Sequence, residues 1–250
     1  MPGPRVYIHE FIDIIGHNRA RYMYHMTANW GPIGRAERAQ SCFGVWGVVG
    51  STGQWPQVVN LWEYDGWDAL GANFETELTG AGLQDPSLED WWAAAAEFRS
   101  GGRDRILVAP EWSPSIAALC EHRVQGGLVE AGYAHEVVTC RPGTATELLD
   151  RVRAEGVAAY ANSGLTLVGA FARAMAADDE CILIWAFATW AEWAASEADG
   201  GGAAARWRRE QFDLATGWER IVLADAPLSP LRIGRQPDEG DREPARENNL

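Results

Sequence analysis

The chain lacks the signals that mark membrane and secreted proteins. No apolar run approaches the length needed to span a lipid bilayer. The first residues, Met-Pro-Gly-Pro-Arg, do not form a basic region followed by an apolar one, so we expect no signal peptide. The four cysteines are scattered without CxxC spacing, which is typical of free thiols in a reducing compartment. These absences predict a cytoplasmic protein that has no membrane partner.

Positive charge is scarce. The 250 residues include 21 Lys and Arg against 35 Asp and Glu, and the formal net charge is −14 at pH 7. Binding of nucleic acid requires concentrated positive charge, because the phosphates must be neutralised. The sequence therefore argues against a nucleic-acid partner, and the negative charge mainly favours solubility.

Motifs that hold common cofactors are absent as well. The sequence has no GxGxxG or GxxxxGK[ST] motif for a nucleotide, and no serine in a nucleophile elbow. It has no HExxH or CxxC motif, and His17 and His25 are eight residues apart, not four. None of the five histidines lies in a haem-attachment motif. We predict no metal and no organic cofactor, and keep haem as an alternative.

The sequence does contain a tandem repeat. Residues 58–70 and 181–193 share a pair of tryptophans that bracket another aromatic residue. The matching positions are Leu61-Trp62, Tyr64 and Trp67 in the first segment, and Ile184-Trp185, Phe187 and Trp190 in the second. Further matches keep the same order: residues 7–11 with 133–137, 102–107 with 217–222, and Ser113-Pro114 with Ser229-Pro230. Matches in a constant order predict a duplicated structural unit.

Each copy has the pattern of a strand, a helix, a strand hairpin, a helical region and a last strand. In the first copy we expect strands at 5–14, 42–49, 58–64 and 105–109, and helices at 17–38 (interrupted near Gly31-Pro32), 67–77 and 88–98. In the second we expect strands at 133–140, 165–172, 181–187 and 220–223, and helices at 144–160, 190–198 and 203–214. This β-α-β-β-α-β order is the ferredoxin-like unit, and two such units can close a barrel that leaves no exposed edge.

The predicted fold is therefore α+β, with two tandem ferredoxin-like repeats forming one barrel as a pseudo-dimer. We place the first repeat at residues 1–112, a linker at 113–130 and the second repeat at 131–232. Residues 233–250 are rich in Pro, Glu and Arg and lack apolar anchors, so we expect a disordered tail there.

The first copy carries a further distinctive pattern. It consists of the run Val58-Val59-Asn60-Leu61-Trp62-Glu63-Tyr64-Asp65, a helix, and then Asp85-Pro86 and Trp91-Trp92. This pattern resembles the NIPSNAP family, and both halves, residues 5–112 and 131–231, are similar to it. The resemblance implies the dimeric α+β barrel superfamily, whose members include cofactor-free oxygenases acting on aromatic ketides, cyclases, isomerases, chlorite dismutases and haem-degrading enzymes. The matching positions are mostly structural, so the resemblance implies no catalytic residue.

The two copies differ most in their first helix. The helix at 144–160 has an aliphatic stripe, whereas residues 17–30 contain no Leu, Ile or Val. A mixture of Tyr, His, Asn, Met and Trp suits the polar and aromatic wall of a pocket. A helix buried between the halves, or between subunits, favours similar residues. Both interpretations stay open.

His9 is the other candidate for chemistry. It lies in mid-strand, and histidine titrates in the range needed for proton transfer near neutral pH. Its counterpart His135 favours a shared structural role for the pair, and Glu10, duplicated as Glu136, is predicted to be structural. The predicted catalytic residues are His9, His17, His25 and Tyr22. The predicted substrate-binding residues are Arg21, Tyr24, Asn29, Trp30, Trp46 and Trp62.

Together these features predict an enzyme that acts on a small apolar or aromatic organic molecule by acid–base chemistry. The reaction would be that of an isomerase, lyase, cyclase or cofactor-free monooxygenase. The alternatives are a non-enzymatic binding or assembly protein, and a haem-binding enzyme of the same superfamily. The expected partner is the small-molecule substrate, and a homodimer is compatible with the pattern. A composition rich in Ala, Gly, Arg and Trp suggests specialised metabolism.

Overall fold

The computed structural model of the chain describes residues 3–79, 82–126 and 130–242. The first half contains β1 (Val6–Ile14), α1 (Arg19–Tyr24), the π-helix η1 (His25–Trp30), α2 (Gly31–Glu37), β2 (Ser41–Val48), β3 (Gln57–Tyr64), α3 (Trp67–Glu77), the 3-10 helix η2 (Pro86–Leu88), α4 (Glu89–Ala96) and β4 (Arg99–Val108). α5 (Ile116–Val124) follows.

The second half repeats this order. It contains β5 (Gly132–Cys140), α6 (Ala145–Arg151), the π-helix η3 (Val152–Gly156), α7 (Val157–Ala161), β6 (Leu165–Arg173), β7 (Glu180–Phe187), α8 (Trp190–Ala198), α9 (Ala203–Glu210), the 3-10 helix η4 (Gln211–Asp213) and β8 (Ala215–Asp225). α10 (Pro230–Ile233) and the 3-10 helix η5 (Glu239–Asp241) end the described chain.

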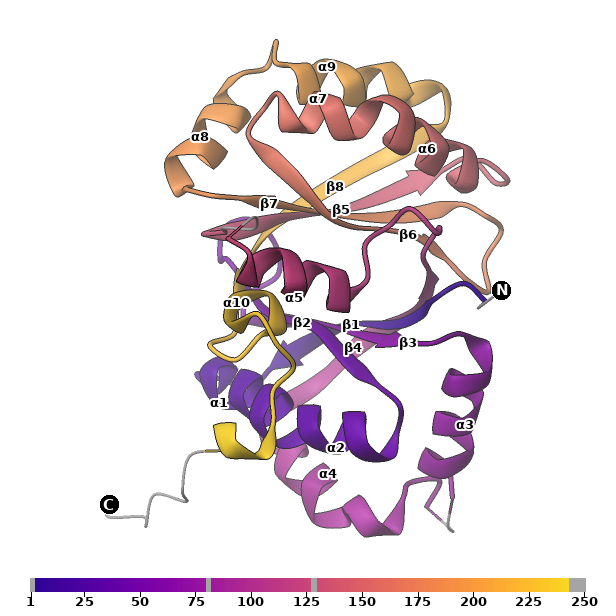
Figure 1. The fold of residues 1–250 in the computed structure, drawn as a ribbon, viewed down its shortest axis with the longest axis vertical. Coiled ribbons are helices and arrows are strands. Elements are labelled where there is room, and N and C mark those ends of the chain that lie inside the picture. The colour runs from indigo at the N-terminus through magenta and orange to yellow at the C-terminus, as the bar shows by residue number, and fades with distance from the viewer. Residues whose placement is uncertain (1–2, 80–81, 127–129, 243–250) are drawn as a thin grey trace.

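The eight strands form one closed antiparallel barrel in the order β1-β3-β2-β8-β5-β7-β6-β4. Within each half the strands pair over most of their length, whereas the halves meet in short seams at β2–β8 and β4–β6. The helices of the first half cover one side of the barrel and those of the second half cover the opposite side (Figure 1). The structure therefore confirms the predicted α+β fold with two ferredoxin-like repeats.

The duplicated tryptophans occupy equivalent places. Ile8 of β1 pairs with Trp62 of β3, and Ala134 of β5 pairs with Trp185 of β7. The register corrects the alignment of the last strands. His9 pairs with Arg105 and His135 pairs with Ile221, so residues 102–107 match 218–223, one position later than the sequence suggests. A shift by one residue exchanges the two faces of a strand, and this changes which side chains correspond.

The first helical segment also differs from the prediction. The chain stays helical through Gly31-Pro32, where the π-helical turn η1 passes directly into α2. The irregularity lies earlier, in the π-helical turn η1, and the second half has a matching turn, η3. π-helical turns inside helices often accompany functional sites.

The predicted linker is partly helical and packs on the barrel. Ser115 caps α5 by accepting a hydrogen bond from the backbone N–H of Ala118 at 3.2 Å. Ile116 and Leu119 join the apolar core inside the barrel. The Ile116 N–H also donates to Glu63 Oε2 at 3.1 Å. The segment therefore closes one part of the core.

The described part of the predicted disordered tail makes specific contacts. Gln236 accepts a hydrogen bond from the Cys42 N–H at 2.9 Å and donates one to the Cys42 carbonyl at 2.7 Å, as a neighbouring strand would. Arg242 Nε donates to the Ala28 carbonyl at 3.2 Å. The described part of the predicted tail, residues 233–242, thus contacts the first half, and residues 243–250 lie outside the described chain.

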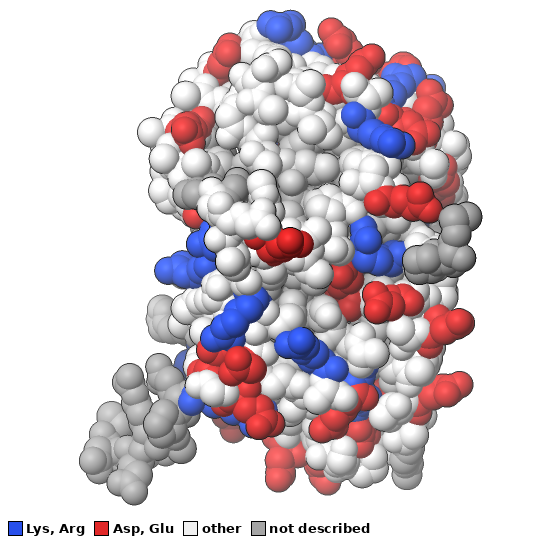
Figure 2. All heavy atoms as spheres, in the orientation of Figure 1, with Lys and Arg blue, Asp and Glu red and all other residues white. Residues whose placement is uncertain are grey.

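The core has three parts, one inside the barrel and one under each helical layer. On the face shown in Figure 2, acidic and basic side chains are interspersed over both halves. None of the helices in the described ranges has the length and apolar character needed to cross a lipid bilayer.

Candidate functional site

Two glutamates occupy equivalent positions on the outer face of the barrel, under the helices of each half. Glu10 of β1 pairs with Asn60 of β3 and with Asp104 of β4. Glu136 of β5 pairs with Leu183 of β7 and Arg220 of β8. Asp104 therefore stands in the first half where Arg220 stands in the second.

Glu136 has a complete set of partners. It accepts hydrogen bonds from the Tyr160 hydroxyl at 2.8 and 2.9 Å, from Trp185 Nε1 at 3.1 Å and from Arg220 Nε at 2.7 Å. The Tyr160 ring stacks on Trp185 with centroids 3.8 Å apart, and Trp207 packs edge-on. The carboxylate is fully buried beneath these rings. This glutamate is a structural element of the second half.

Glu10 has fewer partners and remains half-buried. Its Oε2 accepts hydrogen bonds from Trp62 Nε1 at 2.7 Å and Asn60 Nδ2 at 2.9 Å. Asn60 Nδ2 also donates to the Tyr22 hydroxyl oxygen at 2.9 Å. Within the described chain no arginine forms an ion pair with Glu10, in contrast to the Arg220–Glu136 pair of the second half.

A cavity of about 380 Å³ lies beside this carboxylate, and we call it the Glu10 cavity. Its aromatic and methionine side chains are Met26, Trp30, Trp62, Phe74, Trp91, Trp92 and Met175. Its charged side chains are Glu10, Glu77, Arg99, Asp104, Arg105 and Arg173. The lining comes from β1, β3 and β4, from the helical layer of the first half, and from the hairpin that follows β6. The site thus combines planar apolar walls with a few convergent polar groups, as small-molecule sites do.

The electrostatic environment makes Glu10 a weak acid. Burial, followed by the negative charge of Asp104, raises the pKa of Glu10 to about 6, although the hydrogen bonds from Trp62 and Asn60 act in the opposite direction. Burial also raises the pKa of Asp104. A carboxyl group with a pKa near neutral can both take and return a proton at physiological pH.

Three arginines, Arg99, Arg105 and Arg173, are among the residues that line the same cavity, and Arg105 directs its guanidinium toward Phe11 on the inner face of the barrel. Arg105 Nε lies 3.1 Å from Glu180 Oε1, and the Arg105 side chain is only 8% exposed. Its Nη1 is buried and has no hydrogen-bond partner within the described residues. The Arg99 guanidinium lies 5.4 Å from the centroid of the Trp92 ring. A guanidinium placed as that of Arg99 is can stabilise negative charge on a bound molecule.

The structure divides the residues predicted from the sequence among several places. Trp30 and Trp62 line the Glu10 cavity, and Tyr22 lies fully buried behind Asn60. Arg21, Tyr24, His25 and Asn29 line a separate cavity with Ala20 and Phe98. There the His25 ring stacks on Trp91, and burial lowers the pKa of His25.

The remaining predicted residues lie away from both cavities. His9 points into the barrel, fully buried, and its Nε2 lies 2.9 Å from Nε2 of His135. Trp46 is fully buried in the barrel and packs edge-on against Tyr133. His17 is exposed in the turn before α1. The structure therefore does not bring the predicted catalytic histidines together.

Sequence reasoning missed the polar half of the cavity. The sequence predicts a structural role for Glu10, because Glu136 duplicates it. The sequence repeat also aligns Asp104 with Glu219. The useful signal was the difference between the copies on the last strand. It becomes visible only when the register places Asp104 opposite Glu10 and Arg220 opposite Glu136.

Comparison with known proteins identifies the fold. No family model matches the sequence, and no curated protein matches it either. An anthrone oxidase-like protein superposes with a TM-score of 0.60 at 12% identity, over 89% of this chain and 91% of that one. A protein from Fusobacterium nucleatum subsp. nucleatum, named as a candidate monooxygenase, superposes with a TM-score of 0.58 at 10% identity. The match covers 90% of this chain and 94% of that one. Chlorite dismutase from Candidatus Nitrospira defluvii superposes with a TM-score of 0.51 at 10% identity, over 91% of this chain and 92% of that one. At these identities the likeness shows a shared α+β barrel fold and nothing finer.

The haem alternative can be tested against the cavity. Haem iron is held by an axial His, Cys or Tyr in most proteins, with Met as a partner in some. The described residues that line the Glu10 cavity include no His, Cys or Tyr. In the second half, Tyr160, Trp185 and Trp207 fill the space beside Glu136. These residues do not fit a haem group. The described chain also has no cluster of three or more His, Cys, Asp or Glu placed to hold a metal ion.

Proposed function

We propose that the chain is an enzyme that removes a proton from a small aromatic substrate in the Glu10 cavity and directs the resulting carbanion to molecular oxygen without an organic cofactor. The observation that carries this proposal is the contrast between Glu10 and Glu136. The two carboxylates have equivalent positions, but Glu10 borders a cavity and faces a second carboxylate, whereas Glu136 is fully buried and pairs with Arg220. Its pKa of about 6 suits a general base.

In the proposed reaction, the Glu10 carboxylate takes a proton from a carbon conjugated with a carbonyl group. The electron pair of that C–H bond stays on the substrate, and the carbanion forms a C–O bond with oxygen. The peroxide takes the proton back from Glu10 and loses water, which leaves a ketone. Each turnover therefore consumes one oxygen molecule and returns Glu10 to its starting state.

The other cavity residues support this chemistry. Proton removal shifts negative charge onto the substrate's carbonyl oxygen, and the Arg99 guanidinium, which lines the same cavity, can stabilise it. Trp30, Trp62 and Trp91 offer flat faces to an aromatic ring. The comparisons favour oxygenation over isomerisation, elimination or cyclisation, since one neighbour is named anthrone oxidase-like and another a candidate monooxygenase.

Anthrone is a suitable first probe, because its oxidation by oxygen to anthraquinone and water follows this scheme. Oxygen uptake and the absorbance of the quinone measure turnover, and deuterium exchange of the acidic C–H under nitrogen measures the first step alone. We expect Glu10→Gln to lower both rates by about 10²–10⁴-fold. The matched variant Glu136→Gln should keep the turnover of the folded fraction. Wild-type rates in Glu10→Gln would contradict the proposal.

Isomerase, lyase and cyclase reactions share the first step, and they would give deuterium exchange without oxygen uptake. A non-enzymatic binder would bind anthrone in both wild type and Glu10→Gln, with neither exchange nor uptake.

Membership of the NIPSNAP family and a homodimer stay predictions, and light scattering of the purified protein tests the second.

A further inference from the structure

A third cavity opens at one end of the barrel and has a volume of about 350 Å³. We call it the barrel-end cavity. Its lining residues are Phe11, Asp13, Gln54, Gln57, Gly102, Arg103, His135, Val137, Glu219 and Ile221. None of them lines the Glu10 cavity. Arg103 and Asp104 are neighbours on β4 and point to opposite faces, so the two cavities lie on the two sides of this strand.

His135, which lines this cavity, forms a pair with His9, which lies behind the lining. The rings of His9 and His135 are 16° from parallel with centroids 5.1 Å apart, and their Nε2 atoms are 2.9 Å apart. The two Nε2 atoms are much closer together than the two ring centroids, so the rings meet end to end, as an N–H···N hydrogen bond requires. In a neutral pair, one ring donates through Nε2 and the other carries its proton on Nδ1.

The outer nitrogens of this pair have no partner. Both rings are fully buried, and neither Nδ1 has a hydrogen-bond partner in the part of the chain that the structure describes. Leaving a buried polar group unpaired is costly, so an unpaired one often indicates a missing ligand. His135 is the member of the pair that borders the cavity.

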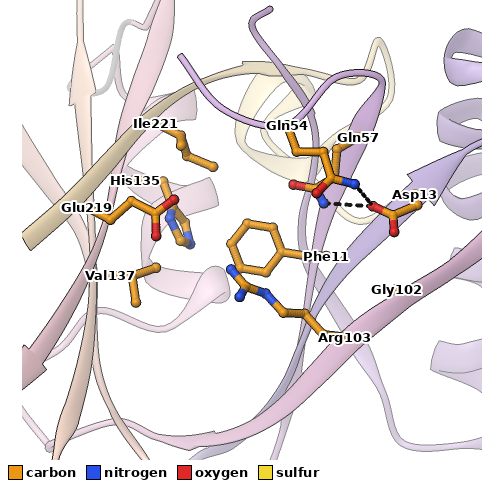
Figure 3. Close-up of a pocket in the computed structure, with 10 residues that line it drawn as sticks. All are labelled: Phe11, Asp13, Gln54, Gln57, Gly102, Arg103, His135, Val137, Glu219 and Ile221. Carbon is orange, nitrogen blue, oxygen red and sulfur yellow. Dashed lines mark hydrogen bonds between the residues drawn. The ribbon is translucent and has the colours of Figure 1, made fainter. Parts of the chain in front are cut away.

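The charges that act on His135 are positive. Burial, then Arg105 and Arg103, lower the pKa of His135 to about 3, so the ring is neutral. The Arg103 guanidinium lies 4.7 Å from the centroid of the Phe11 ring and forms no ion pair with the described residues. In Figure 3, Phe11, Arg103 and His135 face the same space.

The two carboxylates that line the cavity have different surroundings. Asp13 Oδ1 accepts hydrogen bonds from Gln54 Nε2 at 2.6 Å and Gln57 Nε2 at 2.9 Å, drawn as dashed lines in Figure 3. Glu219 is exposed, so solvent screens its charge. The cavity therefore presents an exposed guanidinium that forms no ion pair with the described residues and a buried imidazole whose Nδ1 has no partner among them.

We infer that the barrel-end cavity binds a small organic carboxylate. The carboxylate accepts hydrogen bonds from the Arg103 guanidinium and from Nδ1–H of His135, and the apolar part of the ligand packs on Phe11, Val137 and Ile221. Binding fixes the tautomers, because His135 then accepts at Nε2 and His9 donates. The site is independent of the proposed function, since it shares no lining residue with the Glu10 cavity.

Benzoate is the probe, and benzamide is its uncharged equivalent of the same shape. Isothermal titration at constant ionic strength should show saturable binding of benzoate and at least about tenfold weaker binding of benzamide. Arg103→Gln should weaken benzoate binding by about tenfold or more. Arg103 is exposed, so this variant should fold, and circular dichroism checks that it does. Arg141→Gln, another exposed arginine outside the cavity, is the matched control and should bind as wild type does.

Nitrogen NMR of the imidazoles locates the site. Benzoate should shift the ring nitrogens of His135 and His9 and leave those of His122, which is exposed on α5, unchanged. The inference would be overturned by equal binding of benzoate and benzamide, or by wild-type affinity in Arg103→Gln. Chemical shift changes confined to the Trp62 indole would overturn it too. Absence of any benzoate binding would overturn it as well.

Discussion

Asp104 lies opposite Glu10 in the β1–β4 ladder, so two carboxylates face each other on the wall of one cavity. The charge of Asp104 contributes to the raised pKa of Glu10. In the second half the corresponding neighbour is an arginine, which forms an ion pair with its glutamate. The two glutamates therefore have opposite electrostatic surroundings, a second carboxylate beside Glu10 and a guanidinium beside Glu136.

Removing the charge of Asp104 should make Glu10 more acidic. Asp104→Asn removes one of the two causes that raise the pKa of Glu10, leaving burial as the other. The acid limb of the kcat/KM profile should therefore move to lower pH, since Glu10 loses its proton earlier. The control is Asp90→Asn, an exposed aspartate on α4 that lines neither cavity. An unchanged acid limb in Asp104→Asn would argue against Glu10 as the base.

Removing the hydrogen bond that the Trp62 indole donates to Glu10 should make Glu10 less acidic. The hydrogen bond from Trp62 Nε1 lowers the pKa of Glu10, so Trp62→Phe should raise that pKa and move the acid limb to higher pH. Trp185→Phe removes the equivalent donor from Glu136. It should leave the pH profile of the folded enzyme unchanged while lowering the free energy of unfolding by about 1 kcal/mol. Shifts of equal size in both variants would contradict this assignment.

The pH dependence of stability should also distinguish the two glutamates. The pKa of Glu10 rises from 4.5 to about 6 on folding, so the native state binds this proton more tightly than the unfolded state does. Its contribution to stability is present below the unfolded pKa and is lost as the pH rises from 4.5 through about 6. Above that range, Glu10→Gln should be more stable than wild type by roughly 1–2 kcal/mol.

Glu136→Gln should behave in the reverse way in the same urea titrations. It removes the partner of the Arg220 guanidinium, whose side chain is 19% exposed. We expect a loss of about 3 kcal/mol in the free energy of unfolding. A destabilised Glu10→Gln above pH 6 would mean that Glu10 is structural, as its duplicate is.

The C-terminal segment should contribute to stability. Gln236 makes two hydrogen bonds to the backbone of Cys42, so Gln236→Ala should lower the free energy of unfolding by roughly 1–2 kcal/mol. A chain of this length should then melt about 2–8 °C lower. A chain ending at residue 242 keeps these contacts and is the control. If removing residues 235–250 leaves the melting temperature unchanged, the contacts contribute nothing.

The sequence by itself determined the duplicated architecture. Strands keep a period of two and amphipathic helices a period near four, so the repeat predicted all eight strands and the barrel they form. Of the three tryptophans that the sequence predicts as walls of a pocket, Trp30 and Trp62 line the Glu10 cavity, whereas Trp46 is buried in the barrel. These inferences depend on local patterns, which a single chain carries in full.

Only the tertiary structure decided which residues meet. Which side chain lies opposite Glu10 depends on the register between strands, and a displacement of one residue replaces Asp104 by an arginine at 103 or 105. The pairing of His9 with His135 requires the barrel to close, because their strands belong to different halves. Burial then sets the pKa of Glu10 and of both histidines. Strand register, barrel closure and side-chain burial depend on contacts between segments that are distant in the sequence. The local pattern of one segment therefore does not determine them.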